Sequence, residues 1–242
     1  ELGSVNPMFV MPGALASRGP AIAEGWAGSL TMGAGQFCTN PGIAVVPSGA
    51  EGDAFAEAAK GALAGVGAQT MLTDGIASAY REGRDRVSGS AGVREILTST
   101  CDLRNATPYL YEVSADDWLA NEELGEEVFG PLGVMVRVSS LEQMSAIAGS
   151  MQGQLTATVH VDEADHADAA RLMPLLIRKV GRVLANGYPT GVEVADSMVH
   201  GGPYPASTNF GATSVGTLAI RRWLRPVCFQ NMPDALLPED LR

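Results

Sequence analysis

Cys38 is the residue whose surroundings in the sequence best suit a reactive thiol. It stands in the segment Gly-Gln-Phe-Cys-Thr-Asn-Pro-Gly at residues 35–42, after a glycine-rich approach and before a Pro-Gly break. This punctuation predicts a turn, not the interior of a helix. Consecutive backbone N–H groups in a tight turn stabilise a thiolate, the nucleophilic form of cysteine, and also hold an oxyanion. The same residues fit a buried cysteine that packs as a small apolar side chain, and the pattern alone does not decide between the two.

Two further segments place carboxylates beside turn-forming residues. Glu1 begins the run Glu-Leu-Gly-Ser-Val-Asn-Pro, and Glu126 and Glu127 directly precede Val-Phe-Gly-Pro. Taken alone, each carboxylate favours an ordinary solvated charge. The run His-Gly-Gly-Pro that begins at His200 suggests a hydrolase oxyanion loop. We discard that hypothesis because the sequence contains no Gly-x-Ser-x-Gly nucleophile elbow.

Strand-like and helix-like segments alternate along the chain with short links. Apolar runs bounded by Gly, Pro or polar residues predict strands at residues 42–47, 110–113, 134–138, 155–161 and 181–185. Helical periodicity and capping residues predict helices at residues 53–63, after Thr73 or Asp74, after Ser140, and at 165–176. This alternation predicts an α/β fold, a mostly parallel open sheet with helices on both faces.

The C-terminal residues differ from the rest. Residues 219–231 alternate well enough to predict a late strand, which Pro226 confines to a sheet edge. Residues 233–242 predict a surface tail. We therefore expect a thiol-bearing α/β domain over residues 1–218, followed at 219–242 by a strand and tail that serve oligomerisation or docking.

Composition limits the partners and the compartment. The chain has 242 residues, with 16 Lys and Arg against 27 Asp and Glu, and its net charge of -11 argues against nucleic-acid and anionic-membrane partners. Three cysteines are too few for a disulfide framework, and their spacing predicts no metal site, so we expect a reducing, cytoplasmic compartment. No apolar run approaches the roughly 20 residues of a membrane span. Because the sequence starts at Glu1 without Met, we expect a fragment or a processed product.

Together these segments resemble the aldehyde dehydrogenase superfamily. Glu-Leu-Gly, then Gly-Gln-x-Cys, then Glu-Glu-Val-Phe-Gly-Pro follow one another in the family's order and spacing, and Asn186-Gly187 and the Asn-Phe-Gly turn at residues 209–211 add to the match. The cysteine and Glu-x-Phe-Gly-Pro motifs are highly specific as a pair. The resemblance covers nearly the whole chain and corresponds to the second, catalytic half of a full-length member.

The resemblance implies a role for each matching residue. Cys38 corresponds to the nucleophile and Glu1 to the general base that activates water. Glu127 corresponds to the carboxylate that holds the nicotinamide-side ribose, with Phe129 and Leu2 beside the nicotinamide. The remaining matches imply side chains that line the aldehyde tunnel, namely Phe37, Thr39, Tyr204 and Phe210.

The implied activity is oxidation of a small-molecule aldehyde to the acid with NADP or NAD. A thiohemiacetal on the cysteine loses a hydride, and water hydrolyses the resulting thioester. The sequence has no glycine-rich dinucleotide turn, so the upstream cofactor-binding half is expected to be absent. We therefore expect this chain alone to bind cofactor weakly and to turn over little. The family likeness also implies a homo-oligomer, a dimer or a tetramer, with the late strand joining the oligomerisation sheet.

The sequence does not decide the substrate, and it leaves two other classes of protein as alternatives. The variants Asn-Phe-Gly-Ala-Thr-Ser-Val-Gly at residues 209–216 and His-Gly-Gly-Pro-Tyr-Pro at 200–205 resemble the α-ketoglutaric semialdehyde (2,5-dioxovalerate) dehydrogenase branch. Long-chain fatty aldehyde dehydrogenases are the alternative within the family. A non-catalytic binding or assembly domain is a second alternative. A thiol acyltransferase or hydrolase is a third, which would need a histidine beside Cys38, and neither His160, His166 nor His200 is near it in sequence. A semialdehyde carboxylate would need a cation, and the sequence does not choose among Arg18, Arg81 and the other arginines.

Overall fold

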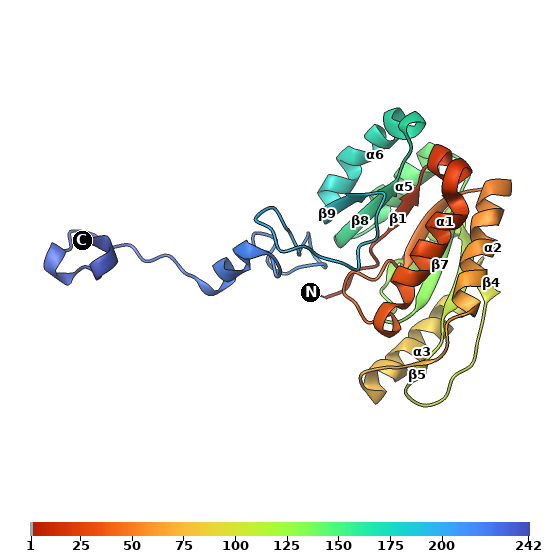
Figure 1. The fold of residues 1–242 in the computed structure, drawn as a ribbon, viewed down its shortest axis with the longest axis horizontal. Coiled ribbons are helices and arrows are strands. Elements are labelled where there is room, and N and C mark those ends of the chain that lie inside the picture. The colour runs from red at the N-terminus through yellow and green to blue at the C-terminus, as the bar shows by residue number, and fades with distance from the viewer. Residues whose placement is uncertain (1) are drawn as a thin grey trace.

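A seven-stranded sheet forms the centre of the computed structural model, which describes residues 2–242 (Figure 1). The strand order is β4-β6-β7-β2-β1-β8-β9, and every neighbouring pair is parallel except β4 with β6. The strands are β1 (Met8–Val10), β2 (Ile43–Pro47), β4 (Arg94–Leu97), β6 (Tyr109–Ser114), β7 (Leu132–Val138), β8 (Gln154–His160) and β9 (Val180–Ala185). A separate antiparallel pair joins β3 (Gln69–Thr70) and β5 (Asn105–Ala106). The predicted mostly parallel α/β sheet is confirmed.

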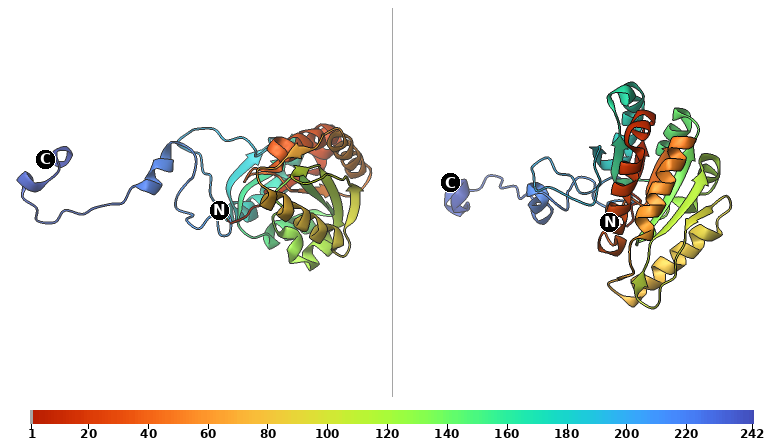
Figure 2. Two further views of the ribbon diagram at one scale, coloured as in Figure 1. Left: turned by 90° about the horizontal axis from the view of Figure 1, so that it is seen from below. Right: turned by 45° about the vertical axis from the view of Figure 1, so that its right-hand side comes forward.

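Helices cover both faces of the sheet (Figure 2). One face carries α1 (Pro12–Thr31) and α2 (Ala50–Ala64), and the other carries α3 (Asp74–Gly89), α4 (Ala115–Ala120), α5 (Leu141–Ser150) and α6 (His166–Lys179). Strand alternation sends successive side chains to opposite cores, so Met8 and Val10 pack with α1 while Phe9 packs with the other layer. The predicted strands and helices before residue 186 all match these elements to within one residue where they extend beyond them.

Local chemistry explains where the predicted helices begin. The Ser140 hydroxyl accepts a hydrogen bond from the backbone N–H of Gln143 at 3.3 Å, and Thr73 does the same for Ile76 at 3.2 Å. A hydroxyl at this position satisfies one of the N–H groups that the first helical turn leaves unpaired. The sequence predicts the Ser140 cap, and it leaves the start of the other helix open between Thr73 and Asp74. Within residues 2–242, no helix has the length and apolar character needed to cross a membrane.

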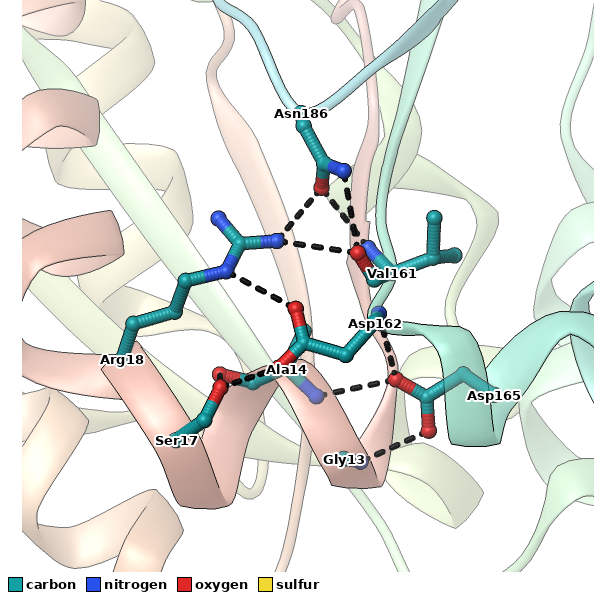
Figure 3. Close-up of polar contacts among 8 residues, drawn as sticks. All are labelled: Gly13, Ala14, Ser17, Arg18, Val161, Asp162, Asp165 and Asn186. Atoms are coloured by element: carbon teal, nitrogen blue, oxygen red, sulfur yellow. Dashed lines mark hydrogen bonds and ion pairs between the residues drawn. The ribbon is translucent and has the colours of Figure 1, made fainter.

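Helix α1 was not predicted, because its first half is rich in residues that disfavour helices. Contacts with residues far along the chain stabilise this helix instead. The carboxylate of Asp165 accepts hydrogen bonds from the backbone N–H groups of Gly13 at 2.7 Å and Ala14 at 2.9 Å (Figure 3). A carboxylate here satisfies unpaired donors and interacts favourably with the positive end of the helix dipole. The cap therefore comes from a residue far along the chain, which no local pattern reveals.

A kink in α1 is held by a second set of side chains. Arg18 has the non-helical angles φ -149° and ψ 23°, and its guanidinium binds Asp162 at 3.0 Å, the Val161 carbonyl at 3.0 Å and Asn186 Oδ1 at 2.6 Å (Figure 3). Asn186 also bonds both the N–H and the carbonyl of Val161. The Asn186-Gly187 pair that supported the family resemblance thus has a structural task, which is to tie α1 to the carboxyl ends of β8 and β9.

The predicted late strand at residues 219–231 is wrong. The chain there forms a 3-10 helix, Thr217–Trp223, and then an extended stretch that pairs with no strand among residues 2–242. Pro226 lacks a backbone donor, and a strand is stable only when another strand completes its hydrogen bonds. Residues 221–242 lead away from the body of the molecule, and we call them the C-terminal arm (Figure 1). The arm ends in two exposed short turns, so the predicted surface tail at 233–242 is confirmed.

Candidate active site

The thiol of Cys38 lies in a turn that leads into the amino end of β2. The 3-10 segment Met32–Gly35 ends α1 with three left-handed residues, Gly33, Ala34 and Gly35, at φ 56°, 59° and 67°. The turn is then closed by a hydrogen bond from the Asn40 N–H to the Phe37 carbonyl at 2.9 Å. The predicted turn conformation is confirmed. Because β1, β2, β7 and β8 are parallel, the segments that enter them meet Cys38 at the same edge of the sheet.

Gly35 brings this turn against the Phe-Gly-Pro segment that precedes β7. A Cβ added at Gly35 would lie 2.3 Å from the Gly130 carbonyl carbon and 2.5 Å from the Pro131 nitrogen. No side chain fits at such distances, and φ 67° itself favours glycine. Asn40 joins the same two segments, since its side-chain amide donates to the Gly35 carbonyl at 2.8 Å and to the Gly130 carbonyl at 3.4 Å. The two motifs that carry the family resemblance are therefore in direct contact.

Asn6 connects the Cys38 turn to the N-terminal segment. Its amide nitrogen donates to the carbonyl of Cys38 at 2.9 Å and to that of Asn40 at 2.9 Å, and its side chain is only 1% exposed. Its Oδ1 accepts hydrogen bonds from the hydroxyls of Ser4 and Thr156. The sequence marked the Asn-Pro pair only as a turn signal. The structure shows that Asn6 instead holds the backbone of the thiol-bearing residue.

Gln154, the first residue of β8, completes this buried network. Its Oε1 accepts hydrogen bonds from the backbone N–H groups of Val5 at 2.7 Å and Asn6 at 3.1 Å, and at 3.0 Å it shares the single Ser4 hydroxyl proton with Asn6 Oδ1. The Ser4 hydroxyl in turn accepts from the Leu155 N–H at 3.0 Å. A buried network of hydrogen bonds of this kind fixes one arrangement of the backbone. The segment at residues 2–6 is therefore held rigidly beside the thiol.

His200 lies against the thiol, which sequence reasoning did not anticipate. Its Nε2 is 3.2 Å from Cys38 Sγ, and the residue is only 6% exposed. The neighbouring glycines explain how the segment enters this position. A Cβ at Gly181 would lie 2.1 Å from the Gly201 carbonyl oxygen, and one at Gly202 would lie 2.3 Å from the Gln154 carbonyl oxygen. The His-Gly-Gly run was a usable signal, but it was discarded as a hydrolase loop.

Arg182 on β9 adds positive charge to the site. Its guanidinium donates to the carbonyls of Gly191 at 2.8 Å and Pro189 at 2.7 Å. Burial lowers the pKa of Arg182, while negative charge on Cys38 acts in the opposite direction. The guanidinium and the thiol therefore interact electrostatically. No sequence pattern had distinguished Arg182 from the other arginines.

The predicted cofactor-side residues line two adjoining hollows. Leu2, Gly3, Glu127 and Tyr204 line one hollow, and Glu127 and Phe129 line a second that shares Ser4 and Val5 with the first. A Cβ at Gly3, which has φ 145°, would lie 3.5 Å from Glu127 Oε2. The structure thus gathers Leu2, Glu127 and Phe129 as expected. It places Tyr204 with them, although the resemblance had implied an aldehyde-tunnel position.

The other predicted residues differ in their surroundings. Phe37 packs its ring over Gly33, where an added Cβ would lie 2.9 Å from ring carbon Cε2, and it remains 36% exposed. Thr39 is buried, with 4% exposure, and Phe210 is 82% exposed. Glu1, the predicted general base, lies outside the described residues. The tunnel roles of Phe37, Thr39, Tyr204 and Phe210 stay predictions.

The fold is shared with aldehyde dehydrogenases of known structure. The structure superposes with a TM-score of 0.73 on an NAD-dependent aldehyde dehydrogenase from Sinorhizobium meliloti, covering 92% of this chain and 43% of that one at 20% identity. This likeness shows a shared fold. No protein-family model matches the chain.

Sequence comparison gives the closer relationship. The chain is 50% identical over its whole length to alpha-ketoglutaric semialdehyde dehydrogenase 2 of Azospirillum brasilense, covering 46% of that protein. It is 42% identical over its whole length to the alpha-ketoglutaric semialdehyde dehydrogenase of Acinetobacter baylyi, covering 47% of it. Over its whole length the chain is therefore similar to the second half of named semialdehyde dehydrogenases. It spans about half the length of the curated relatives it matches.

Proposed function

We propose that this chain is the catalytic part of an NAD- or NADP-dependent dehydrogenase that oxidises α-ketoglutaric semialdehyde. The observation that carries the proposal is the site itself, a thiol on a glycine-shaped turn with the Glu127-lined hollow at the same edge of the sheet. The substrate is inferred from the two relatives that carry that activity in their names. Long-chain aldehydes are the alternative substrates.

The groups on this chain supply a nucleophile and hold charge. Cys38 Sγ adds to the aldehyde carbon, and the carbonyl π electrons move to oxygen, where the backbone N–H of Cys38 stabilises the oxyanion. Arg182 favours the anionic forms of the site because it places positive charge near the thiol. The nicotinamide cofactor, when bound, accepts the hydride that leaves the former aldehyde carbon. Water then cleaves the thioester, with Glu1 proposed as its base.

The residues around the hollow fit a nicotinamide ribose. Carboxylate oxygens accept hydrogen bonds from two adjacent hydroxyls, and Glu127 lines both hollows. Gly3 offers no side chain on the side that faces Glu127 Oε2, so the carboxylate has room for a ligand beside it. Phe129 and Leu2 supply apolar surface next to this carboxylate. These four residues would hold the nicotinamide end of the cofactor.

The test restores an upstream half from a full-length relative and follows reduced nicotinamide formation from α-ketoglutaric semialdehyde with NAD and with NADP. Cys38→Ala should abolish turnover, whereas Cys228→Ala, at an exposed cysteine, should leave it unchanged. The chain without that half should show little turnover. If the wild type oxidised neither this semialdehyde nor a panel of short and long aldehydes, the dehydrogenase proposal would be wrong.

One observation favours a second function. A hydrolase or acyltransferase that uses Cys38 needs a histidine beside the thiol, and His200 is 3.2 Å away. The relationship to dehydrogenases weighs against it, and the cofactor requirement separates the two. Turnover of an acyl ester at a rate that matches or exceeds aldehyde oxidation, without nicotinamide, would support the hydrolase.

We also propose that the protein assembles as a homo-oligomer through its C-terminal arm. Apolar side chains of the arm are largely exposed, among them Trp223 at 84% and Leu236 at 67%. The sheet ends at β9, an edge strand whose Val183 is 38% exposed. Exposed apolar surface of this kind marks an interaction site.

A further inference from the structure

The imidazole of His200 contacts the reactive thiol directly. Nε2 lies 3.2 Å from Cys38 Sγ, within the distance at which a proton passes between sulfur and nitrogen. We propose that His200 is a catalytic residue of this site, which takes the Cys38 proton as Sγ adds to the aldehyde carbon. This inference rests on the proposed dehydrogenase function for its substrate, but not for its test.

The backbone of His200 is clamped on both sides. Its N–H donates to Thr213 Oγ1 at 2.8 Å, and its carbonyl accepts from the Ser214 N–H at 2.9 Å. Thr213 Oγ1 in turn donates to the Val215 carbonyl at 2.6 Å. The close packing of Gly201 and Gly202 against β9 and β8 fixes the following residues. The imidazole is therefore presented to the thiol from a rigid segment, as a proton acceptor must be.

The thiol is held equally firmly from the other side. Asn6 binds the Cys38 carbonyl, and Asn40 binds Gly35 in the preceding turn. The two partners of the proton transfer are separated by 162 residues in the chain, yet each has its own hydrogen-bonded support. Such pre-arrangement is typical of a nucleophile and its base. It is not required of a histidine that only fills space.

The positive charge of Arg182 favours the thiolate. Arg182, on β9, interacts electrostatically with Cys38 and so stabilises the negative charge on sulfur. Glu126 and Glu127, on the loop before β7, line the hollow at the same edge of the sheet. The charge of Arg182 thus supports loss of the proton from sulfur, and the neighbouring Nε2 is placed to accept it.

The step balances without an external reagent. The S–H bond breaks, the proton forms an N–H bond at Nε2, and the sulfur electron pair forms the C–S bond while the carbonyl π pair moves to oxygen. When water later cleaves the thioester, the sulfur leaves as a thiolate and regains the proton from Nε2. His200 thus serves the thiol, which leaves the carboxylate of Glu1 to activate water. Each base then has one proton to move.

The test measures the rate at which iodoacetamide alkylates Cys38 from pH 5 to pH 10, followed by peptide mass spectrometry of the 242-residue chain. The assay uses neither aldehyde nor cofactor, so it is independent of the dehydrogenase proposal. We expect His200→Ala to slow alkylation about ten-fold at pH 7 and to move the midpoint of the profile toward about 8.5, the value of an unassisted thiol. His166→Ala, at an exposed histidine, is the matched control and should change nothing.

Two further measurements separate catalysis from packing. His200→Gln fills the space and keeps a hydrogen bond but accepts no proton, so it should behave like His200→Ala; recovery of the wild-type profile in His200→Gln would overturn the proposal. The second measurement keeps His200 and follows its ring ¹⁵N signals against pH. Cys38→Ala should shift the titration of that ring, and an unchanged titration would equally overturn the proposal.

Discussion

At the scale of single residues, the amide of Asn6 decides where the thiol lies. It bonds the carbonyls of Cys38 and Asn40, and it has the left-handed angle φ 48°. Asn6→Ala leaves buried carbonyls unpaired and strains the backbone, so we expect a loss of about 3 kcal/mol in the free energy of unfolding. Urea denaturation gives that loss, and iodoacetamide alkylation shows whether Cys38 has moved.

Asn6→Gly separates the two causes. Glycine adopts φ 48° without strain. The Asn6→Gly variant should therefore lose only the part of the free energy of unfolding that comes from the hydrogen bonds. Asn209→Ala, at an exposed position, serves as the control and should stay within about 0.5 kcal/mol of the wild type. If Asn6→Ala were as stable as this control, the network around the thiol would not hold the turn.

A second residue makes stability depend on pH. His160 is 1% exposed, its two ring nitrogens have no hydrogen-bond partner among residues 2–242, and its ring packs 5.4 Å from that of Tyr188. Burial, and to a lesser degree the charge of Arg18, lowers the pKa of His160 from 6.5 to about 4. The unfolded chain therefore binds a proton below pH 6.5 that the folded chain excludes. Stability is unaffected above pH 6.5 and falls as the pH drops toward 4.

The size of this effect follows from the two pKa values. Between pH 7.5 and pH 5 the wild type should lose about 2 kcal/mol through His160. His160→Phe keeps a ring against Tyr188 and should lack that part of the loss, whereas His166→Ala should retain it. Urea midpoints at the two pH values measure the difference. Equal losses in His160→Phe and the wild type would show that this ring does not titrate as described.

At the scale of elements, the left-handed end of η1 (Met32–Gly35) sets the distance between the thiol turn and the loop before β7. Gly35→Ala would put Cβ 2.3 Å from the Gly130 carbonyl carbon at φ 67°. We expect it to destabilise the fold by about 3 kcal/mol and to slow alkylation of Cys38. Gly28→Ala, inside α1 with open space around it, should instead stabilise by up to about 1 kcal/mol. A neutral Gly35→Ala would mean that the two loops are free to separate.

The elements also show what the sequence could predict. Strands and helices with clear periodicity and caps, such as β2 and α5, were recognised because their signals are local. Helix α1 escaped because Asp165 caps it from 151 residues away at Ala14. His200 escaped for the same reason, since only the folded chain brings it to Cys38. The strand at residues 219–231 was over-predicted because alternation alone does not supply a partner strand.

At the scale of the whole molecule, the site lies at the amino edge of the parallel strands. Ligands of open α/β sheets usually bind at the carboxyl edge. Here the Arg18, Asp162, Asp165 and Asn186 cluster lies at that edge, after β8 and β9, and holds α1 there (Figure 3). The amino edge instead carries the thiol, the imidazole and the Glu127-lined hollow. One end of the sheet thus provides structural closure, and the other presents the reactive groups.

The C-terminal arm leads away from the body of the molecule that contains the sheet (Figure 2). From residue 221 onward every residue is exposed except the half-buried Leu237. Removing residues 225–242 should therefore change the free energy of unfolding by less than about 0.5 kcal/mol. The same deletion should weaken self-association, because it removes the exposed apolar side chains of Val227, Phe229, Leu236 and Leu241.

Sedimentation velocity over a range of concentrations measures the association. A variant in which serine replaces these four residues separates the effect of apolar contact from that of length. If the serine variant associated as the wild type does while the deletion did not, the backbone of the arm, and not its side chains, would join the copies. If neither change affected association, the arm would play no part in assembly, and the predicted docking segment at residues 219–242 would be wrong.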